Sequence, residues 1–360
     1  MNRVIVACAG SGKTTHIVEK AKELSSEKKV LITTFTDNNT LEIIKRFYEI
    51  YGMKPTNVEV LPWFTFQLKH LIRPYQLPFI DGRIENIIMA QGKSVPYKGN
   101  NDKDNYVKDN QIYSDKIALL AFKTLTETQH TFSRLQRIYD YIFIDEFQDM
   151  EGYDLEIIKI LSKNNMSMEI VCDPRQHTFS THYDSKNHKY TCGPLKYIQE
   201  QCHDCFEIDE ISLNGSYRCP QNTIRFASTI FPSLPQSNSL KEYKNGDGIC
   251  FVKESLTIDF LEKNVDVLQL RNSVTTKVND SYSVTTFGKS KGLTRENVLI
   301  YPTGPMLKAI LKKDFSDYKS KSDLYVALTR ARHKTGIIVP DKDYDKFVAI
   351  EEYINSFLDN

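Results

Sequence analysis

The sequence lacks several features that would assign it quickly to a class of protein. No apolar run approaches the roughly 18–20 residues needed to cross a bilayer, so we expect no membrane partner. The formal net charge is only +1, with 47 Lys and Arg against 46 Asp and Glu, and it favours no class of partner. No internal repeat of convincing period occurs, and the amino terminus does not resemble a signal peptide. We therefore expect a cytoplasmic protein whose seven cysteines are mainly free thiols.

Two adjacent carboxylates follow an apolar stretch in the segment IFIDEFQDM, residues 142–150. Acidic residues are depleted in strand interiors, so Tyr141–Ile144 reads as a buried strand that the chain leaves at Asp145. In an open α/β sheet, ligands bind at the carboxyl ends of the strands. Asp145 and Glu146 are therefore expected to meet a cation, and a nucleotide-bound metal ion is the leading candidate.

The other half of such a site is found near the amino terminus. The stretch VIVACAGSGKTTHIV predicts a short strand, a small-residue loop and the start of a helix, in that order. Its segment ACAGSGKT, residues 7–14, fits the phosphate-loop pattern except that Ala7 stands where the pattern has Gly. Gly10 and Gly12 let backbone N–H groups turn inward around phosphate oxygens at a helix amino terminus. A glycine-rich turn that binds nothing is the alternative, and the ordered strand, loop and helix disfavour it.

These two segments predict a division of chemical roles. Lys13 can reach the β- and γ-phosphates, and Thr14 offers its hydroxyl to Mg²⁺. Asp145 is expected to complete the Mg²⁺ site. Glu146 is expected to act as the base that orients the attacking water.

Short apolar strands alternate with amphipathic helices through both halves of the chain, which predicts an α/β fold with two parallel sheets. We expect a first domain over residues 1–75 and 131–210, a small helical insertion over 76–130, and a second domain over 211–360. Residues 286–334 hold eleven Lys and Arg against four Asp and Glu. That excess is either a solvated basic face or a track for a polyanion.

Eight stretches, in chain order, resemble the motifs of the UvrD/Rep/PcrA-type superfamily 1 DNA helicases. They are ACAGSGKTT, TTFTDNNTLEIIKR, FTF, IFIDEFQD, CDPRQHTF, LNGSYRCP, TTFGKSKGLTRENVLIY and LYVALTRAR. The DExQD pattern within IFIDEFQD separates that family from ordinary phosphate-loop ATPases. The resemblance implies two RecA-like cores, ATP and Mg²⁺ as cofactors, and movement on single-stranded DNA, which is 3′→5′ in the resembled family.

The resemblance also implies further site residues. Gln176 would contact the γ-phosphate or the water, Tyr217 would stack on the base, and Arg218 and Arg330 would stabilise the transferring phosphoryl group. The set implied for the nucleotide is Ala9, Gly10, Ser11, Gly12, Lys13, Thr14, Thr15, Tyr217 and Gly292. The set implied for DNA is Thr34, Thr36, Thr65, Phe66, Phe179, Thr286 and Lys289, which offer hydroxyls and a cation to phosphates and aromatic rings to bases. Phe179 could equally be a core residue.

The chain departs from the family pattern in ways that change the expectation. Asn214 stands three residues before Tyr217, where the family has Asn adjacent to Tyr. Only six residues precede the phosphate loop, which leaves no place for the family's adenine-reading Gln, so we expect loose nucleotide selectivity. Arg218 and Thr286 are only 68 positions apart (286 − 218), and UvrD-type helicases carry a large duplex-contacting insertion in that interval. We expect a compact form that unwinds duplexes poorly by itself.

Two functions remain open from the sequence. One is an ATP-driven DNA translocase, and the intact set of catalytic candidates favours it. The other is a regulatory ATPase subunit that gates or loads a partner nuclease, since compact UvrD-like proteins occur beside OLD-type nucleases in Gabija-like antiphage systems. A zinc site that uses Cys192, Cys202 and Cys205 also stays open, although buried thiols are the default reading.

Overall fold

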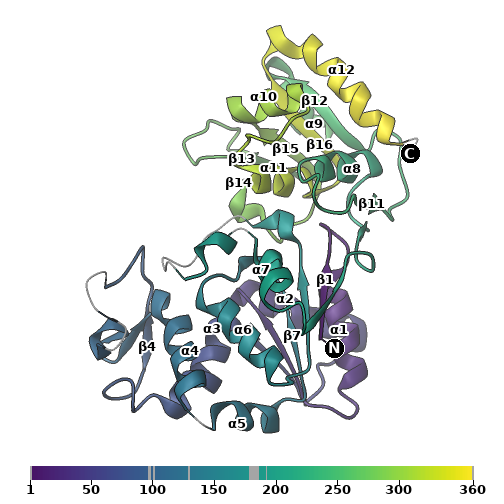
Figure 1. Cartoon of the computed structure of the whole chain (residues 1–360). Helices are drawn as coiled ribbons and strands as arrows, with labels where there is room; N and C mark the ends of the chain where they lie inside the picture. Colours follow the sequence, from purple (N-terminus) through teal and green to yellow (C-terminus); the bar gives the residue numbers. More distant parts are fainter. Residues whose placement is uncertain are drawn as a thin grey trace. The chain divides into compact units, whose positions relative to one another are not determined.

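The computed structural model describes residues 2–95, 99, 102–128, 130–177, 186–191 and 193–358 (Figure 1). The chain divides into two compact units. The first consists of Met1–Ile5, Lys13–Pro174 and Phe179–Asp209, and the second of Val6–Gly12, Arg175–Thr178 and Glu210–Asn360. Each unit carries a sheet of its own, and the expected α/β class with two RecA-like parallel-sheet cores is confirmed.

The first unit is built on a six-stranded sheet in the order β3-β2-β7-β8-β1-β9. The neighbours β2–β3, β2–β7, β7–β8 and β1–β9 run parallel. The strands are β1 (Asn2–Val6), β2 (Val30–Thr34), β3 (Val58–Pro62), β7 (Tyr141–Ile144), β8 (Met168–Cys172) and β9 (Phe206–Asp209). Every residue of β2 and β8 is buried, as expected for inner strands of a parallel sheet covered on both faces.

The helices of the first unit follow these strands along the chain. They are α1 (Lys13–Leu24), α2 (Asp37–Tyr51), α3 (Trp63–Phe66), the π-helical turn Gln67–Ile72, α4 (Ile117–Glu127), α5 (Thr131–Ile138), α6 (Tyr153–Lys163) and α7 (Pro194–Gln201). Helix α2 begins where the Thr36 side chain accepts a hydrogen bond from the Asn39 N–H at 3.2 Å, and it ends at Gly52 in the left-handed conformation. The Thr36 cap marks the start of α2 directly after β2, and Gly52 marks its end.

The insertion contains more than the helices expected from the sequence. Its strands β4 (Asn86–Ile88), β5 (Val107–Lys108) and β6 (Gln111–Tyr113) form a small sheet in the order β4-β6-β5. The sheet precedes α4 in the chain, and the aliphatic residues of α4 are buried. Strands of two or three residues leave no periodic pattern in a sequence, so the small sheet was not predicted.

A buried polar cluster lies beside the π-helical turn. The His70 ring nitrogen Nε2 is 2.9 Å from the Tyr139 hydroxyl, and that hydroxyl also hydrogen-bonds the Glu59 carboxylate. Burial, together with the nearby Lys69 charge, lowers the pKa of His70 to about 4, although Glu59 acts in the opposite direction. An unfolded histidine has a pKa of about 6.5, so folding disfavours the protonated ring.

This cluster predicts a pH dependence of folding stability. The folded state is disfavoured progressively as the pH falls from about 6.5 towards 4, because only the unfolded chain binds the proton in that window. Between pH 6.5 and 4, the free energy of unfolding of His70→Gln should fall by about 1–2 kcal/mol less than that of the wild type. This figure is reduced for solvent screening, because His70 is partly solvated. Denaturant unfolding at several pH values measures the difference. Parallel curves for the two proteins would contradict the assignment.

The second unit has a five-stranded parallel sheet in the order β12-β16-β15-β13-β14. The strands are β12 (Gly248–Lys253), β13 (Val267–Arg271), β14 (Val284–Thr286), β15 (Arg295–Tyr301) and β16 (Ala331–Val339). A two-residue parallel ladder joins β10 (Gly215–Ser216) to β11 (Asn238–Ser239). The helices are α8 (Gln221–Thr229), α9 (Thr257–Lys263), α10 (Gly304–Lys312), α11 (Lys321–Leu328) and α12 (Tyr344–Asn355).

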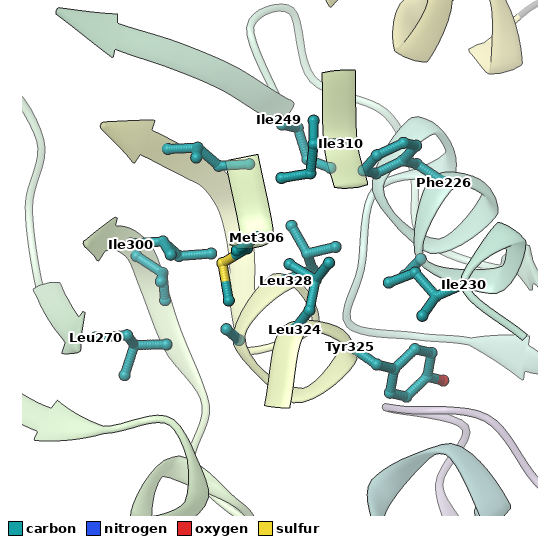
Figure 2. Close-up of a cluster of buried hydrophobic side chains, with 14 of the residues drawn as sticks. Phe226, Ile230, Ile249, Leu270, Ile300, Met306, Ile310, Leu324, Tyr325 and Leu328 are labelled. Carbon is teal, nitrogen blue, oxygen red and sulfur yellow. The ribbon is translucent and has the colours of Figure 1, made fainter. Parts of the chain in front are cut away.

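One apolar core holds this unit together (Figure 2). Figure 2 shows Ile249 of β12, Leu270 of β13 and Ile300 of β15 meeting side chains from helices α8, α10 and α11. The labelled residues are Phe226, Ile230, Ile249, Leu270, Ile300, Met306, Ile310, Leu324, Tyr325 and Leu328. Each large apolar side chain buried here contributes about 1.5–3 kcal/mol. The core therefore fixes α11 and the residues that follow it.

None of the helices in the described part of the chain is long and apolar enough to cross a membrane.

Candidate nucleotide site

The two carboxylates predicted at the end of β7 lie in a tight, buried turn. Asp145 is 2% exposed, and its N–H donates to the Thr33 carbonyl of β2 at 2.9 Å. Glu146 adopts the left-handed conformation, with φ 57° and ψ 36°, and its N–H donates to Asp145 Oδ1 at 2.9 Å. A non-glycine residue held in this region is strained by about 1–3 kcal/mol, and such strain is concentrated at functional sites.

Gln148 holds the Glu146 carboxylate and links it to another segment of the first unit. Its side-chain amide donates to Glu146 Oε2 and accepts the Asp173 N–H at 3.1 Å. Gln148 is 1% exposed, so solvent does not compete for these hydrogen bonds. The sequence assigned no role to this side chain, although the DExQD spacing marked its position. The structure makes it the residue that orients the predicted base.

The electrostatics of the turn favour a cation. Burial and the nearby Glu146 charge raise the pKa of Asp145 to about 7, and Lys13 at the start of α1 opposes the rise. At the end of β2, the hydroxyls of Thr33 and Thr34 are buried without a hydrogen-bond partner. A hydrated Mg²⁺ would stabilise the ionised carboxylate and give such oxygen atoms partners. The residues present therefore fit a metal-bound nucleotide.

The phosphate loop has the backbone that its sequence predicts. Gly10 and Gly12 adopt positive φ of 74° and 85°, which a side chain rarely tolerates. At Gly10 a Cβ atom would also lie 2.5 Å from Arg218 Cβ, so the loop and the Arg218 backbone approach each other closely. Ser11 is buried and its hydroxyl has no partner, as is suitable for a loop that encloses phosphate oxygens.

Two tyrosines of the second unit contact the phosphate loop. The Tyr217 ring lies 4.0 Å from the position that a Cβ of Gly12 would take, and the residue is 66% exposed. It is thus available to stack on a nucleotide base, as predicted. The Tyr325 hydroxyl of α11 accepts the Ala9 N–H at 3.1 Å. Tyr325 was not predicted, although it lies within the LYVALTRAR segment.

The predicted phosphate sensors Gln176 and Arg330 lie together in the second unit. Arg330 Nη2 is 3.4 Å from Gln176 Oε1, and Arg330 Nε donates to the Val326 carbonyl at 2.9 Å. Arg330 is 1% exposed. Arg218 Nη1 donates to the Thr329 carbonyl at 3.3 Å, one residue before Arg330. The structure thus gathers Gln176, Arg218 and Arg330 around the end of α11.

Arg175 is a buried cation that sequence reasoning missed. Its guanidinium donates to the Ala7 carbonyl at 3.3 Å and to the Pro235 carbonyl at 2.5 Å. It also lies 5.9 Å from the centre of the Tyr325 ring. A fully buried Arg with these partners supports the phosphate loop from the second unit. The sequence offered only a charged residue within CDPRQHTF as a signal.

The predicted DNA contacts differ in accessibility. Phe66 is 0% exposed and stacks on Trp63 with ring centroids 5.2 Å apart, so it is a core residue and the stacking role predicted for it does not fit the structure. Thr34 is also fully buried. Thr36 is used as the cap of α2, whereas Thr65 and Lys289 are exposed and Thr286 is half-buried. Phe179 and the residues around it lie outside the described residues.

Two further predictions concern Gly292 and the cysteines. Gly292 is exposed, has φ 83° and is free of nearby atoms where a Cβ would be, so nothing in its surroundings opposes a bound ligand. Among the described residues, no group of three or more His, Cys, Asp or Glu side chains could hold a metal ion. Burial raises the pKa of the Cys202 thiol to about 12, as expected for an unreactive thiol. Cys192 lies outside the described residues.

Comparison with known proteins gives two family models that match this chain. The model of the viral superfamily 1 RNA helicase core domain matches residues 105–339, and that of an AAA domain matches residues 1–181. A probable DNA helicase II homolog of Mycoplasma capricolum is 26% identical over 138 residues, which are 38% of this chain and 17% of that protein.

Solved structures that match this chain in the comparison include the arterivirus nonstructural protein 10 helicase. One structure of it has a TM-score of 0.49 and 12% identity, over 95% of this chain and 61% of that one. Its complex with DNA has a TM-score of 0.48 and 13% identity, over 97% and 63%. The chain spans less than two thirds of these relatives and about a sixth of the curated one. Because the helicase core model covers more than half of its length and the phosphate loop and DExQD turn have the geometry described above, this chain belongs to the superfamily 1 helicases.

Proposed function

We propose that this protein hydrolyses ATP and uses the energy to move along single-stranded DNA in the 3′→5′ direction. The observation that carries the proposal is the buried turn in which Gln148 holds the Glu146 carboxylate beside Asp145. Thr14 and Asp145 would hold Mg²⁺, which when bound neutralises charge on the phosphates. A carboxylate held in place by Gln148 is suited to orient one water for in-line attack.

The remaining catalytic roles are assigned by position and charge. Lys13 offers its ammonium to the β- and γ-phosphates, and the loop N–H groups bind phosphate oxygens. Arg218 and Arg330 stabilise negative charge that develops on the transferring phosphoryl group. Gln176 is hydrogen-bonded to Arg330, so a change at the phosphate would reach both side chains together.

For the nucleic acid we propose an aromatic pair in place of Phe66. Phe35 follows β2 and Phe64 lies in α3 directly after β3, and their ring centroids are 6.0 Å apart in an edge-to-face arrangement. Both residues are half-buried, whereas Phe66 is fully buried. Exposed Thr65 and Lys289 and the basic segment 286–334 supply hydroxyls and cations for phosphates.

If the aromatic pair binds DNA, substitution of Phe64 should change DNA affinity, whereas substitution of Phe66 should change folding stability. We expect Phe64→Ala to weaken single-stranded DNA binding by about 1–3 kcal/mol, the usual contribution of one stacked base, and to leave unfolding nearly unchanged. We expect Phe66→Ala to lower the free energy of unfolding by about 3–5 kcal/mol, because it empties a buried site. Fluorescence anisotropy with a labelled oligothymidylate and denaturant unfolding measure the two effects. Equal DNA affinities of Phe64→Ala and wild type would remove the pair from the interface.

The test of the proposed function is ATP hydrolysis with and without single-stranded DNA. We expect DNA to stimulate turnover, and we expect added salt to suppress the stimulation because the contacts are largely to phosphates. Hydrolysis that DNA does not change would argue against a translocase. No hydrolysis with ATP or GTP would argue against any motor function.

A second candidate function has one structural observation in its favour. All residues from 219 to 285 are described, and their helices and strands, α8, α9 and β11–β14, belong to the second unit. No separate duplex-gripping domain lies in that interval. The alternative is therefore a regulatory ATPase subunit that gates or loads a nuclease of the OLD type, as in Gabija-like antiphage systems.

Tailed duplexes presented to the protein alone distinguish the two candidates. Each unwinding step must offset base stacking of about 1.4 kcal/mol per base pair. A translocase that grips its own duplex would separate a 3′-tailed substrate processively. Hydrolysis stimulated by single strands without strand separation would favour the regulatory subunit.

A further inference from the structure

A short run of hydrogen bonds joins the phosphate loop to the segment that carries Arg218. The Cys8 N–H donates to the Leu213 carbonyl at 3.0 Å, and the Tyr217 N–H donates to the Gly10 carbonyl at 2.9 Å. Between them, the Ser216 hydroxyl donates to the Ala9 carbonyl at 2.7 Å. All three contacts lie within the second unit, so they are internal to one packed body.

The Ser216 hydroxyl is the only side chain among these three hydrogen bonds, and it makes further bonds. It accepts the Arg218 N–H at 3.3 Å and the Cys219 N–H at 3.0 Å. Ser216 is 0% exposed, so water cannot replace its hydroxyl. One oxygen atom thus binds a carbonyl of the phosphate loop and the backbone N–H groups of Arg218 and Cys219. Ser216 also stands directly before Tyr217, where the family motif has Asn.

We propose that Ser216 is a positioning residue that sets Arg218 against the phosphate loop. The inference rests on the proposed ATPase function and names a residue through which Arg218 acts. The close approach of Gly10 to Arg218 Cβ leaves little room for a different placement of the arginine. Without the Ser216 hydroxyl, the Arg218 N–H would lose its acceptor and the Ala9 carbonyl its donor, so the guanidinium would no longer be held at one distance from the phosphate site.

The experiment compares two serines that face each other across the β10–β11 ladder. Ser216 pairs with Ser239, whose hydroxyl donates to the Cys219 carbonyl at 2.8 Å but does not touch the phosphate loop. We expect Ser216→Ala to lower kcat for ATP about tenfold to hundredfold, the effect of losing a buried hydrogen bond, with KM changed less than about threefold. Ser239→Ala should keep kcat within about twofold of the wild type while it loses similar stability.

A double-mutant cycle distinguishes positioning of Arg218 from a general contribution of Ser216 to folding stability. In the Arg218→Ala background, Ser216→Ala should lower kcat by less than about twofold more, because the residue it positions is gone. Ser216→Cys, which keeps the side-chain volume with a weaker donor, repeats the comparison if the alanine variant folds poorly. Thermal melts of each variant check folding.

The outcomes distinguish this inference from the proposed function. Full additivity of Ser216→Ala and Arg218→Ala would overturn the positioning role, and so would equal kcat values of Ser216→Ala and Ser239→Ala. If Arg218→Ala alone turns over ATP like the wild type, the role proposed for Arg218 fails instead. If the wild type has no ATPase activity, the proposed function itself fails.

Discussion

Glu146→Gln is expected to bind ATP with nearly normal affinity and to hydrolyse it at least about a hundredfold more slowly. The substitution keeps the size of the side chain and its ability to hydrogen-bond Gln148. It removes the negative charge that accepts a proton from the attacking water. Equilibrium binding of a fluorescent ATP analogue and steady-state phosphate release measure the two effects. Near-normal turnover would exclude Glu146 as the base.

Lys13→Ala supplies the contrasting control for this prediction. Its ammonium contributes charge to binding in the ground state as well as in the transition state, so we expect weaker nucleotide binding together with lost hydrolysis. A Lys13→Ala protein that binds ATP as tightly as Glu146→Gln would mean that the loop N–H groups alone hold the phosphates.

Arg330→Lys is the second substitution for which we expect a large effect. Lysine keeps the positive charge but cannot form the planar fork that contacts Gln176, Thr329 and the Val326 carbonyl together. Arginine groups in this role contribute about 10³–10⁵ to turnover in phosphate-loop enzymes, so we expect kcat to fall by at least about a hundredfold. KM should change much less.

The variant needs a check on folding because Arg330 is almost fully buried. Thermal melting with and without ATP serves that purpose. If Arg330→Lys melts like the wild type, gains stability on binding ATP and hydrolyses it slowly, Arg330 acts on the reaction. If it instead fails to fold, as a purely structural arginine would require, the assignment is wrong.

The sequence predicted the sheets well because their inner strands are buried on both faces. The strand expected at Tyr141–Ile144 is β7, with the same bounds. A helix is harder to bound from its sequence, because α6 runs from Tyr153 to Lys163 while its aliphatic residues cover only Leu155–Leu161. Apolar periodicity marks the buried centre of a helix and not its capped or exposed ends.

The site was predictable where a motif constrains the backbone. Gly10 and Gly12 have the positive φ that the phosphate-loop pattern predicts, and Asp145 and Glu146 follow β7 in a tight turn. The side-chain partners were not predictable, since Gln148 bonds Asp173 across 25 residues and Arg175 bonds Ala7 across 168. No local pattern encodes such distant pairs.

Sequence patterns also fail to show which of Phe64 and Phe66 is buried, although the two residues are close in the chain. The two residues are separated by a single position in the one-turn helix α3. Which of them points into the core depends on Trp63 and His70, which pack against Phe66. A four-residue helix is too short to show its buried face as a sequence pattern.

The membership of the second unit has a consequence for dissecting this protein into parts. Ala9, from the phosphate loop, belongs to the apolar core drawn in Figure 2, and Arg175 donates to Pro235 in the same unit. A fragment cut after Asp209 would leave residues 210–360 without either group and would uncover the Tyr325 hydroxyl and ring. We therefore expect residues 210–360 not to fold when they are expressed alone. Folding should recover when Val6–Gly12 is restored, either on the same chain by circular permutation or in trans as the other part of a split chain.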